Sequence, residues 1–202
     1  MSVWDDTEVP GTAEILTAAN PVDVDTARSP ASEGGVPAKP GFYAWWLTHD
    51  KALPGVPTSP HPMRRELGLL YVGIAPNDEK SKSLLRTRVC GNHLGSSIGG
   101  STLRFGLTSL LWEAQGWHPY ATSSGKIAIP APDRTALTEW MVLNLRVSWC
   151  CMGRPWAVER TLIQEVRPPL NSDHNQRHPF YETLREARKA LAAGARAASA
   201  SP

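Results

Sequence analysis

The sequence contains few cysteines and no long hydrophobic run, and both features narrow the class of protein. Its three cysteines, Cys90, Cys150 and Cys151, form neither a CxxC pair nor a disulfide framework. We therefore expect reduced thiols and a cytoplasmic protein. No window approaches the ~18 consecutive apolar residues of a membrane helix, and the acidic first residues do not resemble a signal peptide. No membrane association is expected.

Acidic residues are missing from one basic segment. The whole chain has a formal charge of only +2, yet residues 80–104 hold several cations and no acid. Such a segment could contact nucleic-acid phosphates, but on charge alone a solvated helix face is slightly favoured. If a nucleic acid binds here, the residues expected to contact its backbone are Lys80, Lys82, Arg86 and Arg104.

The two ends of the chain are poor in large apolar residues. Residues 1–38 predict a largely disordered N-terminal segment, because the stretch TARSPASEGGVPAKP (26–40) has no apolar periodicity. AEILTAAN (13–20) could form one or two helical turns. Residues 192–202, AAGARAASASP, predict a flexible tail. One ordered domain is therefore expected over residues 39–191.

Three short apolar segments within this domain have the composition of strands. They are GFYAWWL (41–47), GLLYVGI (68–74) and RVSWCCM (146–152). The first two are consecutive, and consecutive strands usually pair in antiparallel fashion, even across a long loop.

Apolar spacing and capping residues predict helices between and after these strands. The segments are 81–95, 101–116, 133–145, 155–167 and a terminal helix that docks through Phe180, Leu184 and Leu191. The order of elements predicts an α+β fold with a small, mostly antiparallel three-stranded sheet flanked by helices.

A set of polar residues follows the order of these elements. It comprises Tyr43 and Tyr71 in the first two strands, Arg88 and His93 on the next helix, Glu159 on the helix after the third strand, and Asn171 just beyond it. Taken singly, each is most simply a packing, surface or turn residue. Their ordered occurrence is what indicates a site.

In this order the residues resemble the GIY-YIG nuclease superfamily. GFY stands at the family's first motif, YVG at its second, and LRTRV carries the family's arginine. ERTLIQEVRPPLN is similar to the family's glutamate helix, which reads E-x-x-L-I and then P-x-x-N. The resemblance covers residues 40–180 and implies a GIY-YIG-like nuclease domain over most of residues 39–191.

Two features depart from the family's pattern. Tyr43 and Tyr71 are 28 residues apart, farther than in the usual hairpin, and an inserted proline-rich loop accounts for the difference. The family often has a histidine or tyrosine shortly after its arginine. His93 comes five positions after Arg88, and Asn92 is nearer the usual place. The sequence leaves both residues open for this position.

The resemblance implies hydrolysis of phosphodiester bonds with a divalent metal ion, Mg²⁺ or Mn²⁺. It makes DNA the expected partner and substrate, with RNA as a second option. Glu159 is the implied metal ligand, since one carboxylate can hold a hard cation whose shell is completed by water and phosphate oxygens. Arg88 is the implied clamp on the scissile phosphate. Tyr71 is the implied general base with Tyr43 hydrogen-bonded beside it, provided that Arg88 or the metal lowers a phenol pKa of ~10.

Other polar residues point less clearly to a role. Asp173, His174 and His178 lie in DHNQRH, which lacks the further partners of a metal site. His178 more simply caps the terminal helix. Asn175 is a second amide that could line the same cleft as Asn171.

Two alternatives remain at this point. A catalytically inactive nucleic-acid- or protein-binding module can share the fold, and a misplaced or shielded Glu159 or Arg88 would mark it. In an unrelated α+β protein these residues would be scattered, whereas a nuclease brings Tyr43, Tyr71, Arg88 and Glu159 into one cleft. The sequence contains no recognisable second DNA-reading domain, so the inserted loop 48–66, the segment 116–132 or a partner protein would supply specificity. A homodimer is suggested by the need for two active sites to cut two strands.

Overall fold

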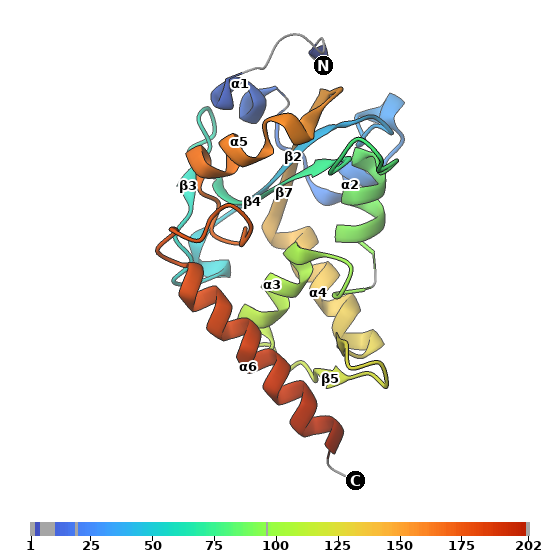
Figure 1. The fold of residues 1–202 in the computed structure, drawn as a ribbon, viewed down its shortest axis with the longest axis vertical. Helices are drawn as coiled ribbons and strands as arrows, with labels where there is room; N and C mark the ends of the chain where they lie inside the picture. Colours follow the sequence, from blue (N-terminus) through green and yellow to red (C-terminus); the bar gives the residue numbers. More distant parts are fainter. Residues whose placement is uncertain (1–2, 5–10, 19, 96, 201–202) are drawn as a thin grey trace.

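A central β-sheet organises the computed structural model, which describes residues 3–4, 11–18, 20–95 and 97–200 (Figure 1). The sheet has five strands in the order β1-β7-β2-β4-β3. They are β1 (Val3–Trp4), β2 (Gly41–Leu47), β3 (Ser59–Pro60), β4 (Gly68–Ala75) and β7 (Leu145–Met152). A separate hairpin consists of β5 (Tyr120–Ala121) and β6 (Ile127–Ala128).

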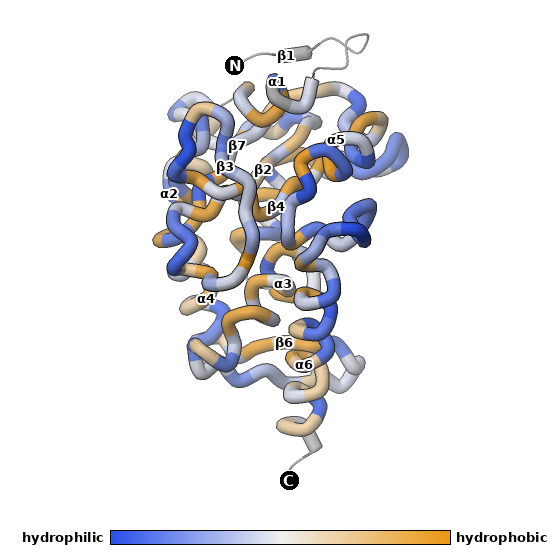
Figure 2. The backbone as a smooth tube through the Cα atoms, turned by 90° about the vertical axis from the view of Figure 1, so that its left-hand side faces the viewer, coloured by the Kyte–Doolittle hydropathy of each residue, from blue (hydrophilic) through white to orange (hydrophobic). Residues whose placement is uncertain are grey.

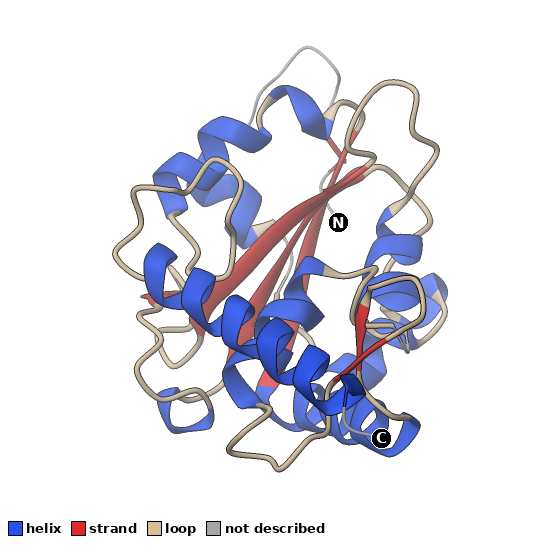
Figure 3. Ribbon diagram, turned by 60° about the horizontal axis from the view of Figure 1, so that its bottom comes forward, coloured by secondary structure: helices blue, strands red, loops and turns tan. Residues whose placement is uncertain are grey.

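Helices surround the sheet and confirm the α+β class (Figure 3). They are α1 (Thr12–Thr17), α2 (Val24–Arg28), the π-helix η3 (Thr87–His93), α3 (Thr102–Leu111), α4 (Ala131–Asn144), α5 (Glu159–Val166) and α6 (Tyr181–Ala200), with short 3₁₀ turns η1 (Ala31–Glu33), η2 (Asp50–Ala52) and η4 (Pro155–Ala157). Among the described residues, no helix is both long and apolar enough to cross a membrane.

The three predicted strands form the centre of the sheet. β2 lies between β4 and β7 and runs antiparallel to both, which confirms the predicted pairing. The sheet also has two edge strands that the sequence did not reveal: β1, parallel to β7, and β3, antiparallel to β4. Each is two residues long, too short to carry an alternating pattern.

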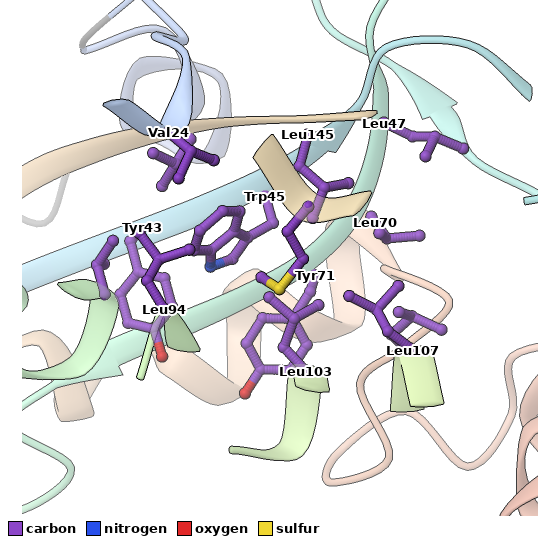
Figure 4. Packing of buried hydrophobic residues seen from close by; sticks show 14 of the residues in the cluster. Val24, Tyr43, Trp45, Leu47, Leu70, Tyr71, Leu94, Leu103, Leu107 and Leu145 are labelled. Atoms are coloured by element: carbon purple, nitrogen blue, oxygen red, sulfur yellow. The ribbon is translucent and has the colours of Figure 1, made fainter. Parts of the chain in front are cut away.

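Strand alternation places the two tyrosines on one face of the sheet. Tyr43 and Trp45 point to this face from β2, and Trp45 lies opposite Tyr71 of β4 (Figure 4). η3, α3 and α4 cover it. The other face presents Phe42 and Trp46, which pack against residues of α1 and α5. In Figure 2 the strands are mainly hydrophobic and many outer loops hydrophilic.

The expectation that residues 1–38 are disordered is wrong for the part of this segment that the structure describes. Val24, Ala27 and Val36 are completely buried, and Val22 forms a β-bridge with Val147 of β7. Asp23 caps α2 by accepting a hydrogen bond from a backbone N–H. These apolar residues are too sparse to form a periodic pattern, yet each one fills a place in the core.

The predicted flexible tail is also wrong over its described residues, because α6 continues to Ala200. Leu191 and Ala195 are completely buried, and Ser199 exchanges hydrogen bonds with the backbone of Ala121 in β5. The repetitive small residues that suggested a tail instead allow the helix to approach its neighbours closely. The ordered domain therefore extends past both ends of residues 39–191.

The glycine of YVG leaves room for the tyrosine of GFY. Gly73 lies opposite Tyr43 in the β2–β4 pair, and a Cβ built on Gly73 would overlap the Tyr43 ring at Cζ and Oη. Tyr43 is only 1% exposed, so its ring has no free space to move into.

Replacement of Gly73 by alanine should therefore destabilise the protein. We expect the free energy of unfolding to fall by about 1–3 kcal/mol, as for other overpacked cores. Gly100→Ala is the matched control, since a Cβ there meets nothing within 4 Å. Urea unfolding checks both variants, and equal midpoints for the two would contradict the steric explanation.

Candidate active site

A π-helix decides which residue follows the arginine. η3 has hydrogen bonds of the i→i+5 type, such as the 3.0 Å bond from the Leu94 N–H to the Val89 carbonyl. The wider turn accommodates one extra residue, so His93 returns to the sheet-facing side five positions after Arg88. His93 is completely buried, whereas Asn92 is partly exposed. The structure thus places His93, and not Asn92, beside the tyrosines.

Three aromatic rings meet at this point. The Tyr43 hydroxyl is hydrogen-bonded to His93 Nε2 at 2.7 Å. The ring centroids of Tyr43 and Tyr71 are 6.4 Å apart, and those of Tyr71 and His93 are 5.7 Å apart. Both tyrosine hydroxyls point in the same general direction (Figure 4). Tyr71 is the more open of the two, at 6% exposure against 1% for Tyr43.

The second nitrogen of His93 is held by the cap of α3. His93 Nδ1 is hydrogen-bonded to Ser101 Oγ at 2.7 Å, and Ser101 also accepts the backbone N–H of Arg104. Burial, together with the charges of Arg88 and Arg104, lowers the pKa of His93 to about 3. The imidazole is therefore neutral at physiological pH, with one nitrogen as donor and the other as acceptor.

Both phenols are protonated at neutral pH. Burial raises the pKa of Tyr43 well above its ordinary value, a charge on Tyr71 would raise it further, and Arg88 opposes the rise. Burial also raises the pKa of Tyr71, again opposed by Arg88. Arg88 thus lowers the pKa of both phenols, as expected, but desolvation raises their pKa by more.

Arg88 and Glu159 join the tyrosines from two different layers. α5 packs on the sheet face opposite the tyrosines, but Glu159 is its first residue, and its charge raises the pKa of both Tyr43 and Tyr71. The charge of Arg88 acts on both phenols and on Glu159. The charges of Arg88 and Glu159 therefore both act on the two phenols.

The Glu159 carboxyl is partly shielded from water. Burial raises its pKa, while the charges of His174 and Arg88 lower it and that of Asp173 raises it. Among the described residues, no group of three or more His, Cys, Asp or Glu side chains is placed to hold a metal ion. A single carboxylate nevertheless suits Mg²⁺ or Mn²⁺ that keeps several waters and takes phosphate oxygens from a substrate. The donor set fits such an ion.

Asn171 supports the site through the backbone. Its side-chain Oδ1 accepts the N–H of Val72 at 3.0 Å, and its Nδ2 donates to the Val72 carbonyl at 2.9 Å. Val72 follows Tyr71 in β4, so Asn171 fastens the segment after α5 to the strand that carries the tyrosine. Both ends of its amide are used in this positioning contact.

The predicted nucleic-acid contacts divide into two groups. Lys80 and Lys82 are exposed. Arg86 instead donates to the carbonyls of Arg28, Ser29 and Val36, which attaches the N-terminal segment to the helix layer. These three bonds occupy the guanidinium of Arg86, so the structure does not favour a phosphate contact there.

The prediction for Arg104 is wrong. Its side chain is 0% exposed and donates to the hydroxyl of Thr138 and to the carbonyls of Arg134 and His93. Burial lowers its pKa to about 10, so it remains charged at neutral pH. The charge count along the chain gave no sign that this cation lies on the inner side of α3.

For some residues near the site, the sequence indicated no role or a different one. The side chain of Thr102 acts to lower the pKa of Tyr71, against the larger effect of burial. Arg188 of α6 is partly buried, and burial lowers its pKa while charges on Tyr71 and Asp173 would raise it. Arg188 had no sequence signal, because it stands in a helix with many exposed charges. DHNQRH was noted as a weak metal motif, whereas its His174 acts on Glu159.

The buried histidine should make stability depend on pH. The unfolded chain binds a proton at His93 near pH ~6.5, but the folded protein does so only near pH 3. Between these values the unfolded state holds more protons, so acidification destabilises the fold, by up to ~1.4 kcal/mol per pH unit.

Urea unfolding at several pH values tests this dependence in wild type and His93→Gln. Glutamine retains a hydrogen-bonding side chain but does not titrate. We expect a shallower loss of stability in the variant between pH ~6.5 and ~3. Parallel curves would show that His93 is not the responsible group.

Comparison with known families agrees with the geometry. The family model described as GIY-YIG catalytic domain matches residues 41–190, from the first residue of β2 into α6. Searches of curated proteins and of solved structures return no match. The family match spans about three quarters of the chain and confirms the resemblance seen in the sequence. The chain therefore belongs to the GIY-YIG nuclease family.

Proposed function

We propose that this protein is a metal-dependent endonuclease that hydrolyses phosphodiester bonds in DNA. The observation that supports the proposal is the cluster of Tyr43, Tyr71 and His93, in which His93 is hydrogen-bonded to Tyr43. The charges of Arg88 and Glu159 both act on the two phenols of this cluster. Phosphodiester hydrolysis needs an activated water and relief of charge on the phosphate. These side chains offer both.

The charged groups of the site would bind the phosphate. Glu159 would hold the divalent ion, which supplies positive charge to the phosphate oxygens and lowers the pKa of a bound water. Arg88 is partly buried and provides a planar guanidinium for the same phosphate. Because both groups lie in a partly desolvated site, their attraction for the phosphate is stronger than it would be in open water.

The aromatic cluster would direct the proton of the attacking water. In the proposed arrangement, Tyr43 donates its hydroxyl hydrogen to the neutral His93 and accepts the hydrogen of Tyr71. As the Tyr71 oxygen takes a proton from the attacking water, its own hydroxyl proton would pass to Tyr43, and the hydroxyl proton of Tyr43 would pass to Nε2 of His93, so that neither phenol holds two protons. The low pKa of His93 suits this role, because it keeps an acceptor nitrogen available to Tyr43. Tyr71 is thus the proposed general base, and Tyr43 and His93 orient it.

The rival interpretation is a catalytically inactive binding module. It would call for a shielded or misplaced Glu159 or Arg88. Both side chains are only partly buried, and each influences both tyrosines, which favours an intact active site. Lys80 and Lys82 are the proposed surface contacts to the nucleic-acid backbone. A homodimer that cuts two strands and a partner protein that supplies specificity both stay predictions.

The Glu159→Gln variant tests the proposal in a cleavage assay. Wild type and variant are incubated with single-stranded DNA, duplex DNA and RNA in Mg²⁺, Mn²⁺ or EDTA. We expect the wild type to cut DNA only when a divalent metal is present. In the variant the cleavage rate should fall at least about a hundredfold, since the neutral amide lacks the negative charge that binds the cation.

Glu139→Gln is the matched control, because it makes the same chemical change at an exposed position on α4. It should cut like the wild type. If no protein cuts any substrate while all bind DNA with a steep salt dependence, the binding module replaces the nuclease. If the wild type cuts RNA but not DNA, the proposed substrate is wrong and is RNA instead.

A further inference from the structure

A polar hollow of about 560 Å³ lies beside the C-terminal end of α5. It is lined by Gln164, Arg167, His174, Asn175, Gln176 and Arg177. The last four belong to the loop between α5 and α6 (Figure 1). We propose that this hollow is a second phosphate subsite, which holds the backbone of the nucleic-acid substrate a few nucleotides from the cut. This inference rests on the proposed function.

The chemistry of the lining suits an anion. Arg167 and Arg177 are exposed and offer planar guanidinium groups, the donors best matched to phosphate. The other lining residues are amides and a histidine, and none of the described residues that line the hollow is a carboxylate. Since the chain carries a net charge of only +2, such a concentration of cations without acids is a local feature of this surface.

Hydrogen bonds hold the hollow in shape before any ligand binds. Asn175 is 4% exposed, and its Nδ2 donates to the carbonyl of Pro168 at 2.8 Å. The guanidinium of Arg167 donates to the backbone carbonyl of Arg177 at 2.9 Å and so joins the two sides. Arg167 and His174 both have left-handed backbones, with φ of 47° and 60°. Such conformations persist in residues other than glycine only where the surroundings hold them.

The hollow adjoins the helix that carries Glu159. Gln164, which lines the hollow, and Glu159 both belong to α5. Gln164 and Arg167 stand five and eight residues after Glu159, or roughly 7.5–12 Å along the chain at helical rise. At ~3.4 Å per nucleotide of B-form DNA, this corresponds to about two to four nucleotides. One strand can therefore reach both places.

Contacts of this kind bind backbone and carry no sequence information. The hollow would lengthen the footprint of a single small domain and strengthen substrate binding without entering the chemical step. Loss of its charge should therefore raise KM and leave kcat nearly unchanged.

The Arg177→Gln variant tests the subsite in the full-length protein. It removes one exposed charge but keeps the backbone carbonyl that accepts from Arg167. Binding of fluorescein-labelled single-stranded and duplex DNA is measured by anisotropy in EDTA over a range of salt concentrations. We expect roughly three- to tenfold weaker binding at moderate salt and a salt slope smaller by about 0.7–0.9, the value for one lost phosphate contact.

Two further variants sharpen the test. Arg167→Asn removes the other arginine and suits a left-handed backbone, so it should weaken binding similarly. Arg196→Gln is the matched control, since Arg196 is exposed in the last turns of α6, away from α5 (Figure 1). Thermal melting of each variant confirms folding.

The outcomes separate the subsite from the function. Weaker DNA binding in both test variants, with unchanged kcat, supports the subsite. Wild-type affinity and salt slope in Arg177→Gln and Arg167→Asn would overturn the subsite alone. Competition by inorganic phosphate as strong as that by unlabelled DNA would also overturn it, because the hollow would then bind free anions. Absence of both DNA binding and cutting in the wild type would remove the proposed function itself.

Discussion

The hydrogen bond between Tyr43 and His93 is the contact on which the rest of the site depends. It joins the central strand β2 to the π-helix, and the other nitrogen of the same imidazole joins the cap of α3 at Ser101. Three elements therefore meet at one neutral ring. Gly73 permits this arrangement, since any side chain there would occupy the place of the Tyr43 ring. The tyrosine of GFY therefore requires a glycine at this position of YVG, because only glycine leaves room for its ring.

The site separates neutral groups from charged ones. Inside, burial keeps Tyr43, Tyr71 and His93 uncharged, because an ion without a partner is costly in a poorly hydrated interior. The charged residues Arg88 and Glu159 are only partly buried, and each influences the pKa of both tyrosines. In the proposed function, a substrate phosphate would pair with Arg88 and a divalent ion with Glu159.

Much of the fold could be predicted, because the strands and helices carry strong local patterns. The three central strands, the Ser101 cap and the docking residues of α6 follow from composition and spacing. The order of Tyr43, Tyr71, Arg88 and Glu159 was readable as well. The N-terminal helix α2 and the end of α6 could not be predicted. Their apolar residues are sparse or small and form no local pattern, and only tertiary contacts bury them.

By itself, the sequence determined the chemical types of the site residues and the elements that carry them, because periodicity and capping act over a few neighbouring positions. Tertiary structure decided the rest. A π-turn selected His93 over Asn92, and the inner side of α3 buried Arg104, although a linear charge count treats it like Lys80. It also brought His174 to Glu159. Burial, pKa and proximity between layers depend on contacts between distant parts of the chain, and no local pattern records them.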